Sequence, residues 1–594
     1  MNLYIKLVIV LVVISGCKKL DQLPEATISK EAIFGSEQGM QLYSNSFYDM
    51  LPTGNAVHRG DEMADYAART TVPDYLRTGA YTSRQSSGWS WTNLRNVNYF
   101  LGNIEGSSLP SETVQHYTAL ARFFRAWFYY EKVQRFGDVP WINMPMDVED
   151  ESLFNARDPR TLVMDSVLAD LNYACDNLRT RSENTRSIIN RNVALAFKSR
   201  VCLFEGTFRK YHSNPGGLAE GMGASATQWL TEAADAARLL IDDGGFSLNT
   251  SGGADRSYRQ LFTSPFPVAN EIILSAVADP ALNVLNDANW WWTSATYGAR
   301  VSLIRTFVNT YLNLDGTPFT SRPGYETMVF SEEMKSRDLR LRQTIRAGDY
   351  KRINGGTEEP APPVFSYTYT GYQPIKWTLD DTYYDGGTRN INSISIIRYA
   401  EVLLNYAEAQ AELGNLTGAE WNNTIGALRR RAGITGNTSS LPVIADAYLQ
   451  TNYFPEIQSP VLLEIRRERG IELVFEGLRF YDLMRWKKGE LLEMPWNGFY
   501  VPSTNQAMDL NEDGKNDVLF FVGTPPSAQA GVTFINVSPT IGNNVNPQQL
   551  KNTNSGELLW LNNIARVWEE KKYLYPVPQN DSLMNPNLGQ NPGW

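Results

Sequence analysis

The sequence contains little cysteine, little histidine and no concentration of positive charge. No two of its three histidines are at a zinc-ligand spacing and no CxxC pair occurs, so a zinc site is not expected. Three cysteines are too few for the disulfide framework of a small secreted protein. The formal net charge is −10 and no block of five or six like charges occurs, so the basic surface that nucleic-acid binding requires is missing.

Long apolar runs are also scarce, and the one near the N-terminus is short. Residues 7–14 follow Lys6 and are too few to span a bilayer as a mature helix, but they fit the apolar region of an export signal. The run leads into Ser15-Gly16-Cys17, which resembles the signal of bacterial lipoproteins, whose cysteine is acylated. We predict a signal peptide over 1–16, lipid attachment at Cys17 and an extended tether over 17–35; an ordinary signal peptide is the alternative.

The rest of the composition is that of a large globular protein rich in aromatic residues. Hydrophobic residues make up 42% and charged residues 20% of the 594 residues, which excludes wholesale disorder. Aromatic residues make up 12%, including 15 Trp and 30 Tyr, which favours a use for ring faces besides packing. Apolar residues at helical spacing predict helices from residue 36, from residue 91, from Ser111 as N-cap to Gly137, and over 159–178, 191–209, 227–243, 301–313, 395–413, 419–432 and 459–475.

The helical pair over 395–432 indicates the architecture. Ala400, Ala407 and Ala411 recur on one helical face, where small residues let a second helix approach closely. No clean 34-residue period runs through the chain, so any repeats are irregular. We predict a mainly α fold: an irregular tetratricopeptide-type scaffold of helical hairpins, with a few short strands and long loop-rich insertions. The body, 36–594, is expected to be a single unit whose opposite face is built by the insertions 53–90, 245–300, 315–395 and 485–560.

Four stretches in this order resemble the SusD/RagB family of outer-membrane nutrient-binding lipoproteins. They are "ARFFRAWFYYEKVQRFGDVPWI" (121–142), "SIIRYAEVLLNYAEAQAELG" (395–414), "EIRRERGIELVFEGLRFYDLMRWKKGE" (464–490) and "KKYLYPVPQNDSLMNPNLGQNPGW" (571–594). The signal sequence, "SRDLRLRQTI" (336–345) and "TGY" (370–372) agree with the resemblance, which covers essentially the whole chain.

The resemblance implies a surface protein that captures a ligand and performs no chemistry. Members of this family sit on the outside of the outer membrane, bind oligosaccharides or, in some members, peptides, and pair with a SusC-like TonB-dependent transporter barrel. It implies a membrane contact through the lipid only and no cofactor. The charged residues of the third stretch are interpreted as a buried ion network that joins a helix to the loop-rich part: Glu464, Arg466, Arg469, Glu472, Glu476 and Arg479.

A sugar-binding site needs ring faces to stack on the apolar side of a pyranose, and polar side chains to satisfy its hydroxyls. The resemblance implies such a site on the face that is built by the loop-rich insertions. It indicates which regions of the chain contribute to the site, but not which residues. The candidates from the first insertion and its edge are Asp61, Asp65, Tyr81, Arg84, Trp89 and Asn93, and those from the second are Asn289, Trp290, Trp291, Trp292 and Tyr297. Weaker candidates are Trp377, Tyr383 and Tyr384, whereas Trp91 begins an amphipathic helix and is expected in the core.

The three consecutive tryptophans in "NDANWWW" (286–292) are the strongest aromatic feature. In an extended backbone Trp290 and Trp292 would face one way and Trp291 the other, so the three rings cannot share one environment. We expect one or two rings to anchor the loop in the core and at least one to be exposed as a sugar platform, with Trp290 and Trp292 favoured for that role.

The stretch "MDLNEDGKND" (508–517) has the spacing of an oxygen-rich calcium loop. Asp509, Asn511, Asp513 and Asp517 occupy ligand positions and Gly514 the turn position. Position 12 is Phe520, so the bidentate glutamate of an EF-hand is missing, and a polar turn is the alternative. A calcium ion here would have a structural role.

Two further functions stay open at this stage. A peptide-binding member would use the same fold, and the aromatic loops favour sugar only modestly. A surface glycoside hydrolase would need two carboxylates at a set separation, which a sequence with 64 acidic residues cannot display.

Overall fold

The computed structural model describes residues 30–147, 149–180 and 183–594. The predicted signal peptide, Cys17 and most of the tether therefore lie outside the described residues. The last part of the predicted tether is not extended, because Lys30–Phe34 forms helix α2, with Ile33 and Phe34 buried against the helical core. Among the described residues, no helix combines the length and the apolar character needed to cross a bilayer.

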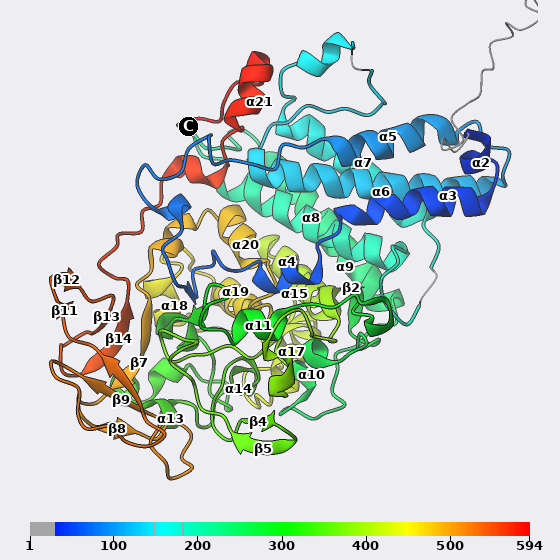
Figure 1. Ribbon diagram of the computed structural model, residues 1–594. Helices are drawn as coiled ribbons and strands as arrows, with labels where there is room; N and C mark the ends of the chain where they lie inside the picture. The colour runs from blue at the N-terminus through cyan, green and yellow to red at the C-terminus, as the bar shows by residue number, and fades with distance from the viewer. Residues whose placement is uncertain (1–29, 148, 181–182) are drawn as a thin grey trace, which may run out of the picture.

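One layer of the molecule consists of long helices packed side by side (Figure 1). Their bounds are α3 (Glu37–Ser44), α5 (Thr92–Ile104), α6 (Ser111–Phe136), α7 (Arg160–Asn177), α8 (Arg191–Tyr211), α9 (Gly223–Asp243) and α15 (Tyr399–Glu412), with α16 (Gly418–Asn423) and α17 (Ile425–Arg431) joining α15. Phe123 and Trp127 of α6 pack against Phe197 of α8 in its core. Small residues set the helix spacing, as expected: a side chain at Gly206 of α8 would meet Leu230 of α9 at 2.9 Å.

The second layer is loop-rich and has its own apolar core (Figure 1). Its helices are α4 (Gly54–Arg59), α10 (Ser257–Thr263), α11 (Ala288–Trp292), α12 (Arg305–Val308), α13 (Phe330–Glu333), α14 (Arg340–Thr344) and α18 (Ala447–Asn452). Helices α19 (Pro460–Glu472) and α20 (Arg479–Arg485) lie between the layers, because their apolar residues enter both cores. Helix α21 (Gln579–Met584) lies near the C-terminus, beside the helical layer (Figure 1).

Short strands pair across long stretches of sequence within the loop-rich layer. The antiparallel pairs are β1 (Ala67–Ala68) with β3 (Ser302–Leu303), β2 (Ile272–Ala276) with β6 (Ile394–Arg398), β4 (Lys351–Asn354) with β5 (Thr357–Pro360), and β11 (Thr540–Ile541) with β12 (Asn544–Val545). An antiparallel sheet has the order β13 (Gln548–Leu550), β14 (Gly556–Trp560), β7 (Asn497–Val501). In a mixed sheet, β9 (Val518–Phe521) lies between β10 (Thr533–Asn536), to which it is parallel, and β8 (Ala507–Met508), to which it is antiparallel.

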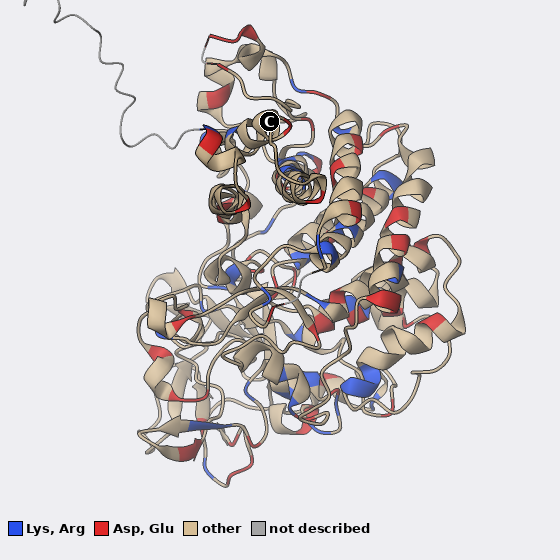
Figure 2. Ribbon diagram, turned by 90° about the vertical axis from the view of Figure 1, so that its right-hand side faces the viewer, with Lys and Arg blue, Asp and Glu red and all other residues tan. Residues whose placement is uncertain are grey.

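A buried ion network joins the two layers, as the sequence predicted for 464–479. Glu472 at the end of α19 binds Arg398 Nη1 through Oε1 (2.6 Å) and Arg340 Nη1 through Oε2 (2.7 Å), and it also binds Arg431. Glu476 binds Arg398 as well (2.7 Å). Basic and acidic residues lie close together where the layers meet (Figure 2). Buried charges are tolerated only when they are paired, so the network holds the two layers in one relative position.

The mainly α fold is confirmed, but several predicted elements differ in the structure. The predicted helix 301–313 is β3 followed by one turn of helix, α12, because β1 pairs with this segment. The predicted helix 419–432 breaks at Thr424, which has a non-helical backbone (φ −113°, ψ −90°). Ser111 is the first residue of α6 rather than its cap. The insertion 53–90, expected from its composition to run over the surface, does so only in part: Tyr66 and its neighbours enter the second core, whereas most of 77–88 is exposed or half-buried.

Candidate functional site

Helix α11 forms the base of an aromatic surface that we call the loop face, made of Arg59, Trp290, Trp291 and Tyr297. Residues 288–292 are helical rather than extended, so consecutive side chains point about 100° apart. The three tryptophans therefore point in three directions, and the expectation based on an extended backbone, that Trp290 and Trp292 share one side, is wrong.

The three tryptophan rings have different environments. Trp292 is 5% exposed and packs against Phe475 of the core, with ring centroids 5.0 Å apart. Trp290 is half-buried and stacks on Tyr297, with centroids 3.7 Å apart and an interplanar angle of 15°. Trp291, also half-buried, lies beneath the guanidinium of Arg59, 4.2 Å from its ring centroid. One ring is thus an anchor and two reach the surface, so Trp291 takes the place that the sequence analysis gave to Trp292.

The carboxylate of Asp287, just before α11, holds these groups together. It accepts hydrogen bonds from Tyr297 Oη (2.7 Å) and Arg59 Nη2, and it lies 3.3 Å from His58 Nε2. Burial opposes ionisation of Asp287, but the hydrogen bonds from His58, Tyr297 and Arg59 outweigh it and hold the pKa of the carboxyl well below its usual range. Asp287 is therefore ionised at neutral pH, and the rings around it are fixed before any ligand binds.

A second tyrosine-bearing turn lies beside α11. Asn289 of α11 donates a hydrogen bond to Asp385 Oδ1 (3.0 Å) at the end of the 3₁₀ turn η7 (Thr382–Asp385). In that turn Tyr383 is 63% exposed, with the Arg389 guanidinium 5.2 Å from its ring centroid. Exposed rings flanked by guanidinium and phenol groups can stack on an apolar face and hydrogen-bond to hydroxyls around it.

Besides Trp292, four predicted ligand residues are buried and serve the fold instead. Asp61 accepts hydrogen bonds from Tyr66 and from two backbone N–H groups after α19, and burial raises its pKa to about 6. Asp65 forms a two-point ion pair with Arg479 (2.8 Å for both contacts). The other two are Asn289, which is bonded to the backbone of Leu379, and Trp89, which packs on Phe136. These side chains cannot reach a ligand without unfolding their surroundings, so we remove them from the site.

The remaining predicted residues of the first insertion lie outside the loop face. Tyr81 packs against Tyr75, Tyr575 and Trp594 near the C-terminus. Arg84 and Asn93 are exposed, and Asn93 lines a depression on the helical layer rather than α11.

Of the weaker candidates, Trp377 is buried and donates a hydrogen bond to the carbonyl of Phe475 (2.8 Å). Tyr383 and Tyr384 stay near the candidate site. Trp91, expected in the core, is half-buried against Trp89 and Phe128.

The sequence analysis missed Arg59 of the loop face and Asp287, the buried carboxylate that holds the loop face together. Asp287 lies three residues before Trp290 in the stretch already singled out, so its place could have been found. The role of Arg59 could not be predicted from the sequence, because its partner Asp287 is 228 residues away. Outside the loop face, Tyr369 and Trp560 stack with ring centroids 3.8 Å apart, and the Arg300 guanidinium lies over the Tyr369 ring, 5.6 Å from its centroid.

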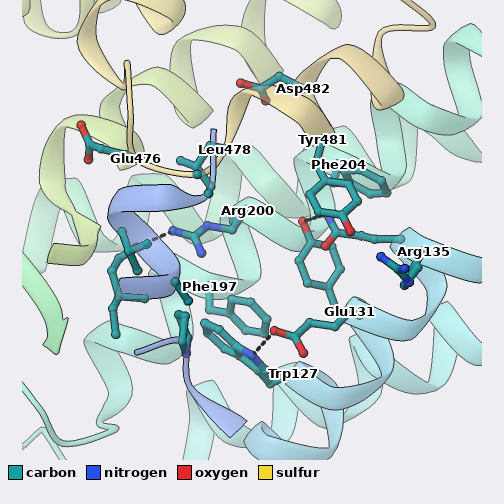
Figure 3. A pocket seen from close by; sticks show the side chains of 18 of the residues that line it. Trp127, Glu131, Arg135, Phe197, Arg200, Phe204, Glu476, Leu478, Tyr481 and Asp482 are labelled. Carbon is teal, nitrogen blue, oxygen red and sulfur yellow. Dashed lines mark hydrogen bonds between the residues drawn. The ribbon is translucent and has the colours of Figure 1, made fainter. Parts of the chain in front are cut away.

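A cleft of about 430 Å³ runs between the two layers (Figure 3). On its helical wall Trp127 stacks on Phe197 with centroids 4.3 Å apart, and Trp127 Nε1 donates to Glu131 Oε1 (2.9 Å). Arg200 in the same cleft makes two hydrogen bonds to Glu401 (2.6 and 2.7 Å). The lining of this cleft includes none of the four loop-face residues, so we do not include it in the candidate site.

The predicted calcium loop folds as a tight polar turn. The Asp509 carboxylate accepts hydrogen bonds from three backbone N–H groups of the loop, those of Asn511, Glu512 and Gly514. Burial, together with the charges of Asp509 and Asp513, raises the pKa of Asp517, so the carboxylates repel one another and a cation would relieve the repulsion. In the part of the chain that the structure describes, however, no cluster of three or more His, Cys, Asp or Glu side chains is placed to hold a metal ion.

Calcium binding therefore stays a prediction with a direct test. If calcium binds, adding it should raise the melting temperature of the protein and a chelator should lower it, because the ion binds only the folded loop. Asp509→Asn keeps an oxygen acceptor for the turn but loses the charge, so it should melt at one temperature in both conditions. A wild-type melting curve that the chelator leaves unchanged would exclude the ion.

Comparison with known proteins identifies the family. The model of the SusD family matches residues 284–594, more than half of the chain. A second family model, described as starch-binding associating with outer membrane, matches residues 35–203. SusD-like protein P2 of Formosa agariphila is 24% identical over 541 residues, which cover 86% of this chain and 94% of that protein. SusD-like protein P38 of the same organism is 23% identical over 514 residues, covering 82% and 91%.

Solved structures share the fold. A SusD-like protein from Bacteroides fragilis matches with a TM-score of 0.67 and 19% identity, covering 96% of this chain and all of that one. A SusD-like carbohydrate-binding protein from the same species matches with a TM-score of 0.66 and 21% identity, covering 94% of this chain and all of that one. Together with the matched family model, these likenesses lead to one conclusion: the chain belongs to the SusD family.

Proposed function

We propose that the protein binds an oligosaccharide or polysaccharide at the loop face and passes it on without chemical change. The observation that carries the proposal is the stacked pair Trp290–Tyr297, which is half-buried at the surface and held by Arg59 and Asp287. An apolar sugar face can stack on such rings, because each ring offers a large apolar surface to bury against the ligand. A related solved structure that is described as carbohydrate-binding supports the ligand class.

The preformed geometry of the loop face favours binding over catalysis. Asp287, the carboxylate that contacts the aromatic residues, is buried and engaged by three side chains, with a pKa well below the usual range. A glycosidase needs a general acid whose pKa is raised and a second carboxylate about 5–9.5 Å away. Asp287 cannot donate a proton in this state, so incubation with glycan should release no reducing sugar; sustained turnover would contradict a binding-only role.

We extend the proposal to the location of the protein and to its partner. Lipid attachment at Cys17 would hold the body at the outer membrane, facing the cell exterior, and a SusC-like TonB-dependent transporter would receive the glycan. The family description that mentions association with the outer membrane supports this location. Acyl chains would provide the anchor, at roughly 0.8 kcal/mol per buried methylene.

A glycan array set against a peptide pool tests the ligand class. The protein without residues 1–17 is labelled and applied to both, and we expect selective retention by a subset of glycans. The exposed Phe154, on the helical layer, provides a matched control: Phe154→Ala removes a surface ring away from α11 and should bind as the wild type does. Retention by peptides alone would replace the sugar-binding proposal by the peptide-binding alternative.

A further inference from the structure

The loop face continues into the segment that follows α11. Tyr297 stacks on Trp290, and a Cβ atom added to Gly298 would lie 2.6 Å from the carbonyl oxygen of Trp291 and 3.0 Å from its ring. Only glycine fits at this position, where the backbone has a φ of 83° and packs directly on α11. The residues that follow Gly298 are thereby fixed in place relative to the rings of the loop face.

Two residues after this turn, Arg300 reaches the second aromatic pair. Its Nε donates to the carbonyl oxygen of Ala295 (2.8 Å), and its Nη1 donates to Tyr369 Oη (3.2 Å). Tyr369 is buried and stacks on Trp560 with an interplanar angle of 10°. Trp560 is half-buried, as Trp290 is, so part of it reaches the surface. The second aromatic pair therefore adjoins the loop face, and Arg300 joins the two.

The backbone and the side chain of Arg300 are both held in a defined position. Its φ of 47° lies in the left-handed region, which residues other than glycine seldom adopt and which recurs at ligand-binding positions. The guanidinium donates two hydrogen bonds to Ala295 and one to Tyr369. Since a guanidinium has five N–H groups, two of them have no acceptor among the described residues. Arg300 is half-buried rather than fully buried, so a ligand can contact it from solvent.

No carboxylate neutralises Arg300 in the part of the chain that the structure describes. Four segments meet around it, namely 67–73, 292–304, 364–375 and 558–566. These segments contain no aspartate or glutamate, although the chain has 64 acidic residues. By contrast, the neighbouring Arg59 and Arg69 are paired with Asp287 and Glu62. A protein with a net charge of −10 thus carries an unneutralised positive charge beside a stacked pair of rings.

From this arrangement we infer that Arg300 and Trp560 form a subsite for an anionic sugar unit, so that the glycan bound by the protein carries carboxylate or sulfate groups. The free N–H groups of a guanidinium suit the oxygens of such an anion, and the neighbouring ring offers the sugar an apolar surface. The next units of the same chain would stack on Trp290 and Tyr297. The inference rests on the proposed function, since it names the class of glycan that the loop face receives.

The test compares charged and uncharged polysaccharides as ligands of the protein without residues 1–17. Polygalacturonate and alginate carry carboxylates, dextran sulfate and carrageenan carry sulfates, and dextran, pullulan and galactomannan carry no charge. Affinity electrophoresis ranks these polymers, and calorimetric titration gives the Kd of the one that binds most tightly. The subsite variant is Arg300→Gln, which removes the charge but keeps an amide that can donate to Ala295. Arg84→Gln is the matched control, because Arg84 is exposed, lies outside the loop face and carries the same charge.

We expect a carboxylated or a sulfated polymer to bind most tightly, and the group that binds identifies the anion. Its affinity should fall as the ionic strength is raised from about 0.01 M to about 0.15 M, because salt screens a charge that is accessible to solvent. Arg300→Gln should bind this polymer at least about tenfold more weakly, the effect of losing a charge-assisted hydrogen bond. Arg84→Gln should bind it as the wild type does.

The other outcomes contradict the inference in different ways. If only uncharged polymers bind, the anionic subsite is excluded and the proposed function stands. The same conclusion follows if Arg300→Gln melts at the wild-type temperature and binds the charged polymer with wild-type affinity. If Arg300→Gln is unstable, the salt dependence of the wild type decides, and an affinity that salt does not change would exclude the subsite. If no polymer of either kind binds the wild type, both proposals fail.

Discussion

Glu472→Gln is expected to destabilise the folded protein by about 3–5 kcal/mol, the usual effect of removing one partner from a buried ion pair. The carboxylate of Glu472 is fully buried and binds Arg340, Arg398 and Arg431. Arg340 and Arg398 keep other acidic partners, but among the described residues Arg431 keeps only Glu271, at 3.3 Å. The amide of glutamine would also direct an N–H₂ donor at guanidinium groups that can only donate.

Denaturant unfolding of the purified variant measures this effect. Glu332→Gln is the control, because Glu332 pairs with Lys335 on the surface and its loss should change the free energy of unfolding by less than about 1 kcal/mol. An unfolding midpoint for Glu472→Gln equal to that of the wild type would show that the network does not hold the layers together.

The same residue predicts a dependence of stability on pH. Burial raises the pKa of Glu472, but Arg431, Arg398 and Arg340 outweigh it, so the pKa in the folded protein lies well below that of an unfolded glutamate. Because its pKa is lower in the folded protein, ionised Glu472 stabilises the fold at pH values above the pKa of an unfolded glutamate, near 4.3. This stabilisation is lost as the pH falls below that value. The difference in stability between wild type and Glu472→Gln should therefore shrink as the pH is lowered below about 4.

Trp292→Ala is expected to cost about 3–5 kcal/mol of folding stability, as for other large aromatic residues deleted from a core. Trp292 is the buried member of the three tryptophans and contacts Phe475, whose backbone N–H and C=O are bonded to Tyr66 and Trp377. A cavity at Trp292 would loosen that junction. Trp292→Phe should recover most of the loss, because the indole Nε1 has no partner in the described residues.

Thermal unfolding of Trp292→Ala, Trp292→Phe and Trp290→Ala, each as a single variant, measures these changes in stability. Trp290→Ala should remain close to the wild type, since Trp290 is half-buried and its contact, Tyr297, lies on the surface with it. The reverse order, with Trp290→Ala unfolded and Trp292→Ala stable, would contradict the assignment of anchor and platform.

The local spacing of apolar residues was sufficient to predict the long helices from the sequence. The predicted ranges 159–178, 191–209 and 227–243 correspond to α7, α8 and α9, because the apolar residues of a long helix repeat at its own period. The resemblance of the stretch 464–490 to family motifs also indicated the buried network of its charged residues, which the structure confirms.

The site was harder to predict, because partners far apart in the sequence decide which polar residues are free. Asp61 and Asp65 lie in a polar insertion, as ligand contacts do. Their partners, however, are the backbone around Gly477 and the side chain of Arg479, more than 400 residues away. Similarly, three tryptophans in a row do not indicate whether their backbone is extended or helical, and that choice decides which rings reach the surface.

The central claim is that a glycan stacks on the rings of the loop face, and calorimetric titration of the wild type and of Trp290→Ala with a glycan selected on the array tests it most directly. We predict that Trp290→Ala folds as the wild type does and binds at least about tenfold more weakly, which corresponds to 1.4 kcal/mol. Phe154→Ala should bind with unchanged affinity. Equal affinity of the wild type and folded Trp290→Ala for that glycan would contradict the account.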